Sequence, residues 1–184
     1  FLVVYKHGAI VLKTTGPSFT ILSDDSKEKL SAVARGRLKI EGNIYPGDRV
    51  LFSRADQNYI IGHVLPRKNL LYRPKVANVD ELVIVVSLKK PKIDYYFLDK
   101  NISLAEWFGI PIIICLNKLD LDGEIAHEVK TLYSNVGYRV IMTSALENMG
   151  IDELQGVISQ KVAVLVGPSG VGKSTILNLF DSSW

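Results

Sequence analysis

A glycine-rich segment near the carboxyl end of the sequence has the composition and spacing of a phosphate-binding loop. Residues 167–174, GPSGVGKS, fit the pattern G-x-x-x-x-G-K-[ST] at every fixed position. The apolar run VAVLV precedes them and STILNLF overlaps and follows them, which predicts a buried strand, a loop and then a helix. Glycines let backbone N–H groups point at a phosphate, and the helix N-terminus adds a favourable dipole. A purely structural turn is the alternative interpretation.

Two side chains of this loop are predicted to act on a bound nucleotide. Lys173 is expected to neutralise the β- and γ-phosphates, and we predict it as the catalytic residue. The hydroxyl of Ser174 is expected to ligate Mg²⁺. A phosphate loop does not select the base, so recognition of the base must come from other residues.

The segment CLNKLD supplies residues that could select guanine. Asn117, Lys118 and Asp120 follow an apolar run that is predicted to be a buried strand. An aspartate carboxylate can accept hydrogen bonds from both N1–H and the exocyclic amine of guanine, whereas adenine offers no such pair of donors. Guanine is therefore the expected base. The alternative is that Asp120 only caps the N-terminus of a helix.

A third short segment, Thr143-Ser144-Ala145, ends another predicted strand. It resembles the S-A motif of GTPases, in which the alanine backbone N–H meets O6 of guanine. Its significance depends on the two other segments, because ligands of parallel sheets bind where several strands end. The residues predicted to bind GTP are Asn117, Lys118, Leu119, Asp120, Ser144, Ala145, Gly167, Pro168, Ser169, Gly170, Val171, Gly172, Lys173, Ser174 and Thr175.

The elements that must position these segments alternate between apolar runs and helical stretches. Strands are predicted over residues 82–88, 110–117, 138–145 and 161–167, with helices over 95–108, 124–134 and 151–159 between them. Such alternation favours right-handed crossovers and a mostly parallel sheet. We therefore predict an α/β nucleotide-binding domain over residues 80–184.

The first 65 residues have a different pattern. Short β-branched and aromatic runs alternate with turn residues, and they predict strands over 2–5, 10–14, 19–22, 30–37, 49–53 and 59–65. Five or six short strands at this spacing indicate a small closed antiparallel barrel, with the five-stranded oligonucleotide-binding (OB) type as the natural candidate. Pro66 and Pro74 mark residues 66–79 as a linker to the second domain.

Positive charge is concentrated in the predicted barrel. The net charge is +3, and residues 1–65 contain nine Lys and Arg against six Asp and Glu. Arg35, Arg37 and Lys39 have i, i+2 spacing, which places them on one face of an extended segment and predicts contacts with RNA phosphates. A mixed solvated surface is the alternative. The aromatic residues Tyr5, Phe19, Tyr45 and Tyr59 could stack on bases or form the barrel core.

Composition limits the class of protein. With 184 residues and 47% hydrophobic content, the chain is long enough for one large domain or two small ones. The longest apolar runs are far shorter than the roughly 20 residues that span a bilayer, so no membrane partner is expected. A single cysteine, Cys115, is expected in the core and favours a reducing compartment, the cytoplasm. Because the sequence begins with Phe1, its native start is expected to be missing.

The order of the three motifs is unusual. Small GTPases have the phosphate loop first and the base-reading motif later, whereas here NKLD and TSA precede GPSGVGKST. Together with the barrel, RGRLK, YPGDRV and RKNLLYRPKVANVDELVIVVSL, these segments resemble the ribosome small subunit-dependent GTPases (RsgA/YjeQ), which are circularly permuted. The resemblance implies GTP hydrolysis stimulated by the small (30S) ribosomal subunit during its late maturation, contact of the barrel with ribosomal RNA, and a monomer.

The family has further parts that this sequence does not contain. A threonine-rich switch, a D-T-P-G segment and a zinc-binding module are expected after the phosphate loop, and hydrolysis is expected only of the complete protein. Asp120, Leu121, Asp122 and Gly123 fit D-x-x-G, but they overlap the base-reading motif, so we interpret this match as chance.

Two other functions remain open from the sequence. GPSGVGKST also resembles the loop of guanylate kinases, which would make the protein a nucleoside-monophosphate kinase, although there the loop lies near the N-terminus. Alternatively, the protein is an RNA-binding assembly module with a vestigial nucleotide site. Other permuted GTPases, which act on the large subunit, are a nearer alternative, but they lack the barrel and carry a P-N-V-G-K-S loop.

Overall fold

The computed structural model describes residues 7–36, 43–55 and 58–180. The chain forms two compact units, Phe1–Val79 and Asp80–Trp184. Residues 66–79, predicted as a linker, thus fall within the first unit. In the described ranges no helix is long and apolar enough to cross a membrane.

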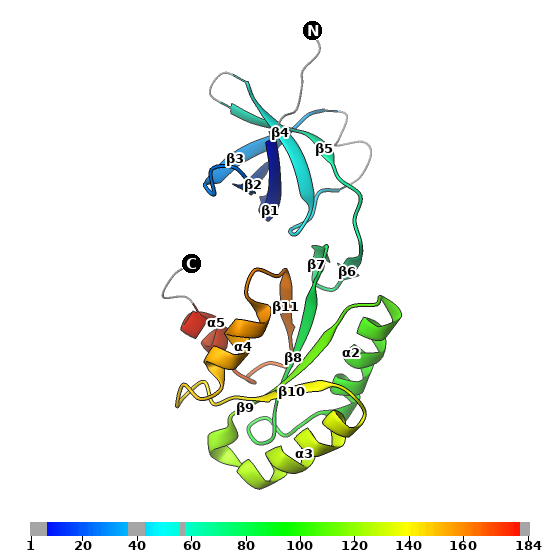
Figure 1. The fold of residues 1–184 in the computed structure, drawn as a ribbon, viewed down its shortest axis with the longest axis vertical. Helices are drawn as coiled ribbons and strands as arrows, with labels where there is room; N and C mark the ends of the chain where they lie inside the picture. Colours follow the sequence, from blue (N-terminus) through cyan, green and yellow to red (C-terminus); the bar gives the residue numbers. More distant parts are fainter. Residues whose placement is uncertain (1–6, 37–42, 56–57, 181–184) are drawn as a thin grey trace. The chain divides into compact units, whose positions relative to one another are not determined.

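The first unit contains a closed barrel of five strands, labelled in Figure 1. These are β1 (His7–Thr15), β2 (Ser18–Ser23), β3 (Lys29–Ala34), β4 (Arg49–Ala55) and β5 (Asn58–Val64), in the order β1-β2-β3-β5-β4. All neighbours are antiparallel except β3 and β5, whose parallel pairing lets five strands close. The predicted five-stranded barrel is confirmed; the strand predicted over residues 2–5 lies outside the described residues.

Alternating side chains fill this barrel. Val11, Ile21, Val50 and Ile61 are at most 1% exposed and belong to one buried cluster. Phe19 and Tyr59 are partly buried against the same cluster. Of the two interpretations of these aromatic residues, base stacking or barrel core, the structure supports the core for these two.

The basic row is only partly described. Arg35 follows β3, is exposed, and donates its backbone N–H to Ile61 O at 3.1 Å. Arg37 and Lys39 lie outside the described residues. The RNA contact of this row therefore stays a prediction.

Residues 66–79 contain a small antiparallel pair that the sequence did not reveal. It consists of β6 (Leu70–Tyr72) and β7 (Lys75–Ala77). Its second strand is joined to the barrel by the backbone bond from Ala77 N to Pro46 O, 2.8 Å. Arg67 adds a second link, because its Nε lies 2.6 Å from the fully buried carboxylate of Asp48.

The second unit is built on a four-stranded parallel sheet, which confirms the predicted α/β class. Its strands are β8 (Glu81–Ser87), β9 (Ile112–Asn117), β10 (Arg139–Met142) and β11 (Ala163–Val166), in the order β10-β9-β8-β11. The connections contain α2 (Tyr95–Trp107), the short 3₁₀ helix η1 (Leu119–Leu121), α3 (Gly123–Asn135) and α4 (Ile151–Ile158), and α5 (Lys173–Phe180) follows β11.

Helices cover both faces of this sheet, which explains why its strands are continuously apolar. Val83 and Val85 of β8 share a buried cluster with Leu154 of α4 and Ile176 of α5. Because strand side chains alternate between faces, the buried Ile84 points to the other face, where Figure 1 shows α2 and α3. The NKLD, TSA and glycine-rich segments follow β9, β10 and β11, and they therefore lie together at the carboxyl ends of the parallel strands.

Candidate nucleotide-binding site

The glycine-rich loop runs from β11 to the first turn of α5. Gly170 and Gly172 have φ values of +80° and +98°, in the left-handed region that favours glycine. At Gly167 a Cβ atom would lie 2.3 Å from Val85 O of the neighbouring strand. Each of these three glycines therefore satisfies a constraint of the backbone that a larger residue meets only with strain or displacement, and Gly167 and Gly172 are the two that the pattern fixes.

Lys173 is the cation of this loop. Its Nζ donates to Gly167 O and Pro168 O, both at 2.8 Å, so the half-buried ammonium lies back over the loop. Ser174 and Thr175, one and two positions further along the first turn of α5, are exposed. The Ser174 hydroxyl is thus accessible beside the predicted phosphate position, which fits one ligand of a Mg²⁺ ion.

A single amide connects all three segments. Asn117, at the end of β9 and 1% exposed, donates from Nδ2 to Val171 O in the glycine-rich loop at 2.8 Å. Its Oδ1 accepts hydrogen bonds from Thr143 Oγ1 at 3.0 Å and from Ala145 N at 3.1 Å. Asn117 therefore fixes the phosphate loop relative to the TSA segment.

The contact of Ala145 differs in one respect from the expectation. The S-A motif implies that the Ala145 N–H meets O6 of guanine, whereas here this N–H already donates to Asn117 Oδ1. A base oxygen would have to share the same donor.

The position of Ala145 depends on a tight turn that the sequence did not single out. Ser144 exchanges two backbone hydrogen bonds of 3.0 Å with Met149. Gly150 has a φ of +66°, and a Cβ there would lie 2.2 Å from Met142 O. Both the positive φ and the close approach of two backbones require a glycine here, and no sequence motif signals it.

Asp120 lies in η1, and its carboxylate faces the TSA segment. Its Oδ1 accepts a hydrogen bond of 2.5 Å from Ser144 Oγ. The residue that caps α3 is Asp122, which accepts from Ile125 N at 3.4 Å. The alternative interpretation of Asp120 as the cap of a helix is therefore wrong, and its carboxylate has no role in starting α3.

The predicted base-reading residues line one cavity of about 300 Å³, at the lower end of the sizes usual for small-molecule sites. Members of all three segments contribute to its wall: Asn117, Lys118, Asp120, Leu121, Ala145, Leu146, Gly172 and Thr175. An aspartate, a lysine stem and apolar side chains around a cavity of this size suit a flat base that carries hydrogen-bond donors.

Cys115 lies directly beneath this site. Burial raises the pKa of its thiol to about 12, and its Sγ lies 3.3 Å from Thr143 Oγ1. The thiol is therefore neutral at physiological pH and acts as a small core residue, as expected.

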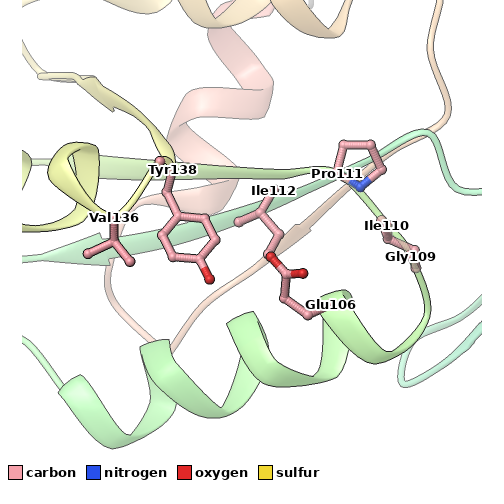
Figure 2. Close-up of a pocket in the computed structure, with 8 residues that line it drawn as sticks. Glu106, Gly109, Ile110, Pro111, Ile112, Val136 and Tyr138 are labelled. Carbon is pink, nitrogen blue, oxygen red and sulfur yellow. The ribbon is translucent and has the colours of Figure 1, made fainter.

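A larger cavity of about 450 Å³ lies at the opposite edge of the sheet, near the start of β9 and the end of α2 (Figure 2). Figure 2 shows the Glu106 carboxylate and the Tyr138 hydroxyl at its border. Burial and the nearby Glu106 raise the pKa of Tyr138. None of its lining residues is positively charged, so it offers a phosphate no cation.

Within residues 7–36, 43–55 and 58–180 no group of three or more His, Cys, Asp or Glu residues could hold a metal ion. The zinc module implied by the family resemblance stays a prediction.

The order of the strands defines the class of protein. The glycine-rich loop follows β11, which comes after β8, β9 and β10 along the chain yet pairs with β8 within the same parallel sheet. The strand that normally opens a GTPase domain thus comes late, and the fold is that of a circularly permuted P-loop GTPase.

The chain belongs to the RsgA GTPase family, whose family model matches residues 64–184. It is 40% identical over 179 residues to the small ribosomal subunit biogenesis GTPase RsgA of Ruminiclostridium cellulolyticum, covering 95% of this chain and 59% of that protein. The protein of the same name from Thermotoga neapolitana is 35% identical over 184 residues, covering 97% and 62%. The chain thus spans about three-fifths of the length of these relatives.

Two solved structures share the fold. The crystal structure of YjeQ from Thermotoga maritima superimposes with a TM-score of 0.88 at 34% identity, and YloQ, described as a circularly permuted GTPase, with 0.79 at 29%. Each comparison covers 97% of this chain and 66% of the other.

Proposed function

We propose that the protein containing this chain binds and hydrolyses GTP, and that it does so on the small (30S) ribosomal subunit during its late maturation. The observation that carries the proposal is the Asn117 side chain, which joins the phosphate loop to the base-reading segments around one cavity. The names of the relatives supply the ribosomal context.

Each segment has a defined role in this proposal. Asp120 accepts N1–H and the exocyclic amine of guanine, the Lys118 stem lies over the base, and backbone N–H groups of residues 167–175 hold the phosphates. Lys173 stabilises the negative charge that develops as water attacks the γ-phosphate in line. Mg²⁺, when bound by Ser174 and the nucleotide, supplies further positive charge. The resemblance assigns the positioning of the water to switch segments that this sequence does not contain.

The barrel is proposed to contact ribosomal RNA. Its support is the excess of positive charge in residues 1–65 and the OB-type order of its strands. Arg35, Arg37 and Lys39 are the proposed phosphate contacts. We further propose that the protein acts as a monomer in the cytoplasm.

Nucleotide competition tests the proposed site and separates it from a kinase. Full-length protein is loaded with a fluorescent GDP analogue and challenged with GDP or ADP. We expect GDP to compete at least about 100-fold better, because adenine leaves the Asp120 carboxylate without its donors. In parallel, phosphate transfer from ATP to GMP is expected to be undetectable. Equal competition by ADP, or rapid transfer to GMP, contradicts the proposal.

A further inference from the structure

The loop between β8 and α2, residues 88–94, passes beside the glycine-rich loop. At its base the Ser87 hydroxyl donates to Pro91 O at 2.8 Å, which fixes the loop to the end of β8. A Cβ built on Gly170 would lie 3.8 Å from Pro91 Cδ, ordinary van der Waals contact. This loop therefore lies beside the phosphate-binding segment, although no motif marks it.

The same loop is joined twice to the turn that carries Asp120. The Lys118 ammonium donates a hydrogen bond to Lys90 O. The Lys89 ammonium forms an ion pair with Asp122, with Nζ and Oδ2 2.9 Å apart. Residues 118–122 are thus held at both ends by residues 89 and 90.

This turn needs such support because its backbone is not relaxed. Lys118 has a φ of +66°, a conformation that costs a non-glycine residue free energy and persists only where neighbours hold it. Asp122 also caps α3, so its carboxylate sets where the turn ends and the helix begins.

The ion pair is better protected than an ordinary surface pair. The Asp122 side chain is 14% exposed, whereas Lys89 is 56% exposed. The hydrogen bond from Lys89 is the largest cause of the lowered pKa of Asp122. Asp122 belongs to the D-x-x-G match of residues 120–123 that we interpret as chance. Its role in the structure is instead the ion pair with Lys89 and the cap of α3.

We propose that Lys89 is a positioning residue for guanine recognition: through its ion pair with Asp122 it holds the 118–122 turn so that the Asp120 carboxylate faces the base cavity. The inference rests on the proposed function, because it names what orients the proposed base-reading residue. Lys89 itself lies outside the residues that line this cavity.

The test compares GDP with IDP in full-length protein. IDP lacks the exocyclic amine, so the ratio of the two Kd values reports how well Asp120 meets the base. Lys89→Ala is expected to weaken GDP binding about three- to tenfold and to lower the GDP-over-IDP preference. Binding of inorganic tripolyphosphate, which reaches only the phosphate loop, is expected to be unchanged. Lys89→Arg is expected to restore most of the preference.

Two further variants exclude a general loss of stability. Lys161→Ala removes the Lys161–Glu81 ion pair, 2.7 Å long with exposures of 37% and 13%, at the start of β8, and is expected to leave both Kd values unchanged. Asp122→Asn keeps a capping oxygen but removes the charge. Its GDP affinity and its GDP-over-IDP preference are expected to match those of Lys89→Ala. The double variant is expected to bind GDP no more weakly than either single variant.

The outcomes separate the two proposals. A wild-type protein that prefers GDP to ADP, together with a Lys89→Ala variant of unchanged GDP-over-IDP preference, overturns the role of Lys89 alone. The role of Lys89 is also overturned if Lys161→Ala lowers the GDP-over-IDP preference as much as Lys89→Ala does. It is overturned as well if the losses of GDP affinity caused by Lys89→Ala and Asp122→Asn add up in the double variant. A wild-type protein with no preference for GDP over ADP overturns the proposed function and the positioning role together.

Discussion

Replacing Lys173 with alanine is expected to weaken GTP binding by about 10²- to 10³-fold and to abolish measurable hydrolysis. The side chain is half-buried, and its Nζ already lies 2.8 Å from two loop carbonyls, so a bound phosphate meets a charge that is in place before binding. Removing it leaves the phosphates without their nearest cation. Titration with a fluorescent GTP analogue and a phosphate-release assay on full-length protein measure both effects.

Two comparisons make the Lys173 result specific. Lys161→Ala removes a lysine of the same unit whose ammonium pairs with Glu81, and it is expected to bind and hydrolyse GTP normally. Thermal unfolding of Lys173→Ala is expected to change little, since only two carbonyl contacts are lost. Near-normal GTP affinity in a folded Lys173→Ala variant would show that the glycine-rich loop does not hold the phosphates.

Changing Asp120 to asparagine is expected to transfer preference from guanine to xanthine nucleotides. Asparagine presents one acceptor and one donor, so its amide N–H₂ would face the exocyclic amine of guanine, whereas xanthine has an oxygen at that position. GTP affinity is expected to fall at least about 100-fold, the cost of a lost charged hydrogen bond and an opposed pair of donors. XTP is expected to compete better than GTP in the same assay.

Asp122→Asn is the matched control for this change. The same chemical substitution, two residues further on, lies at the cap of α3 rather than in the wall of the base cavity. It is expected to reduce GDP affinity modestly and to create no preference for xanthine. If Asp120→Asn also kept guanine ahead of xanthine, Asp120 would not be the residue that reads the base.

The architecture follows from local patterns that the sequence displays directly. Continuous apolar runs predicted the strands of the parallel sheet because helices cover both its faces. The glycine spacing predicted the loop because each fixed glycine meets a backbone constraint, such as the 2.3 Å approach to Val85 O. The β6–β7 pair was not predicted, because strands of only three residues are too short to show a hydrophobic periodicity.

The internal support of the candidate site could not be predicted, because it depends on contacts between distant residues. Asn117 and Val171 are 54 positions apart, and Lys89 and Asp122 meet only because β8 and β9 are neighbours in the sheet. Asp122, and not Asp120, caps α3 because of where the helix begins, a detail of one or two residues that sequence patterns do not fix.

The rate of GTP hydrolysis by the full-length protein, with and without purified small ribosomal subunits, tests the central claim most directly. Lys173→Ala serves as the blank, and ATP as the competing substrate. We expect subunits to raise the rate for GTP by at least about tenfold, with no effect of excess ATP. A rate that stays at the level of the Lys173→Ala blank, with or without subunits, would contradict a GTPase that acts on the ribosome and would leave RNA binding by the barrel as the activity to explain.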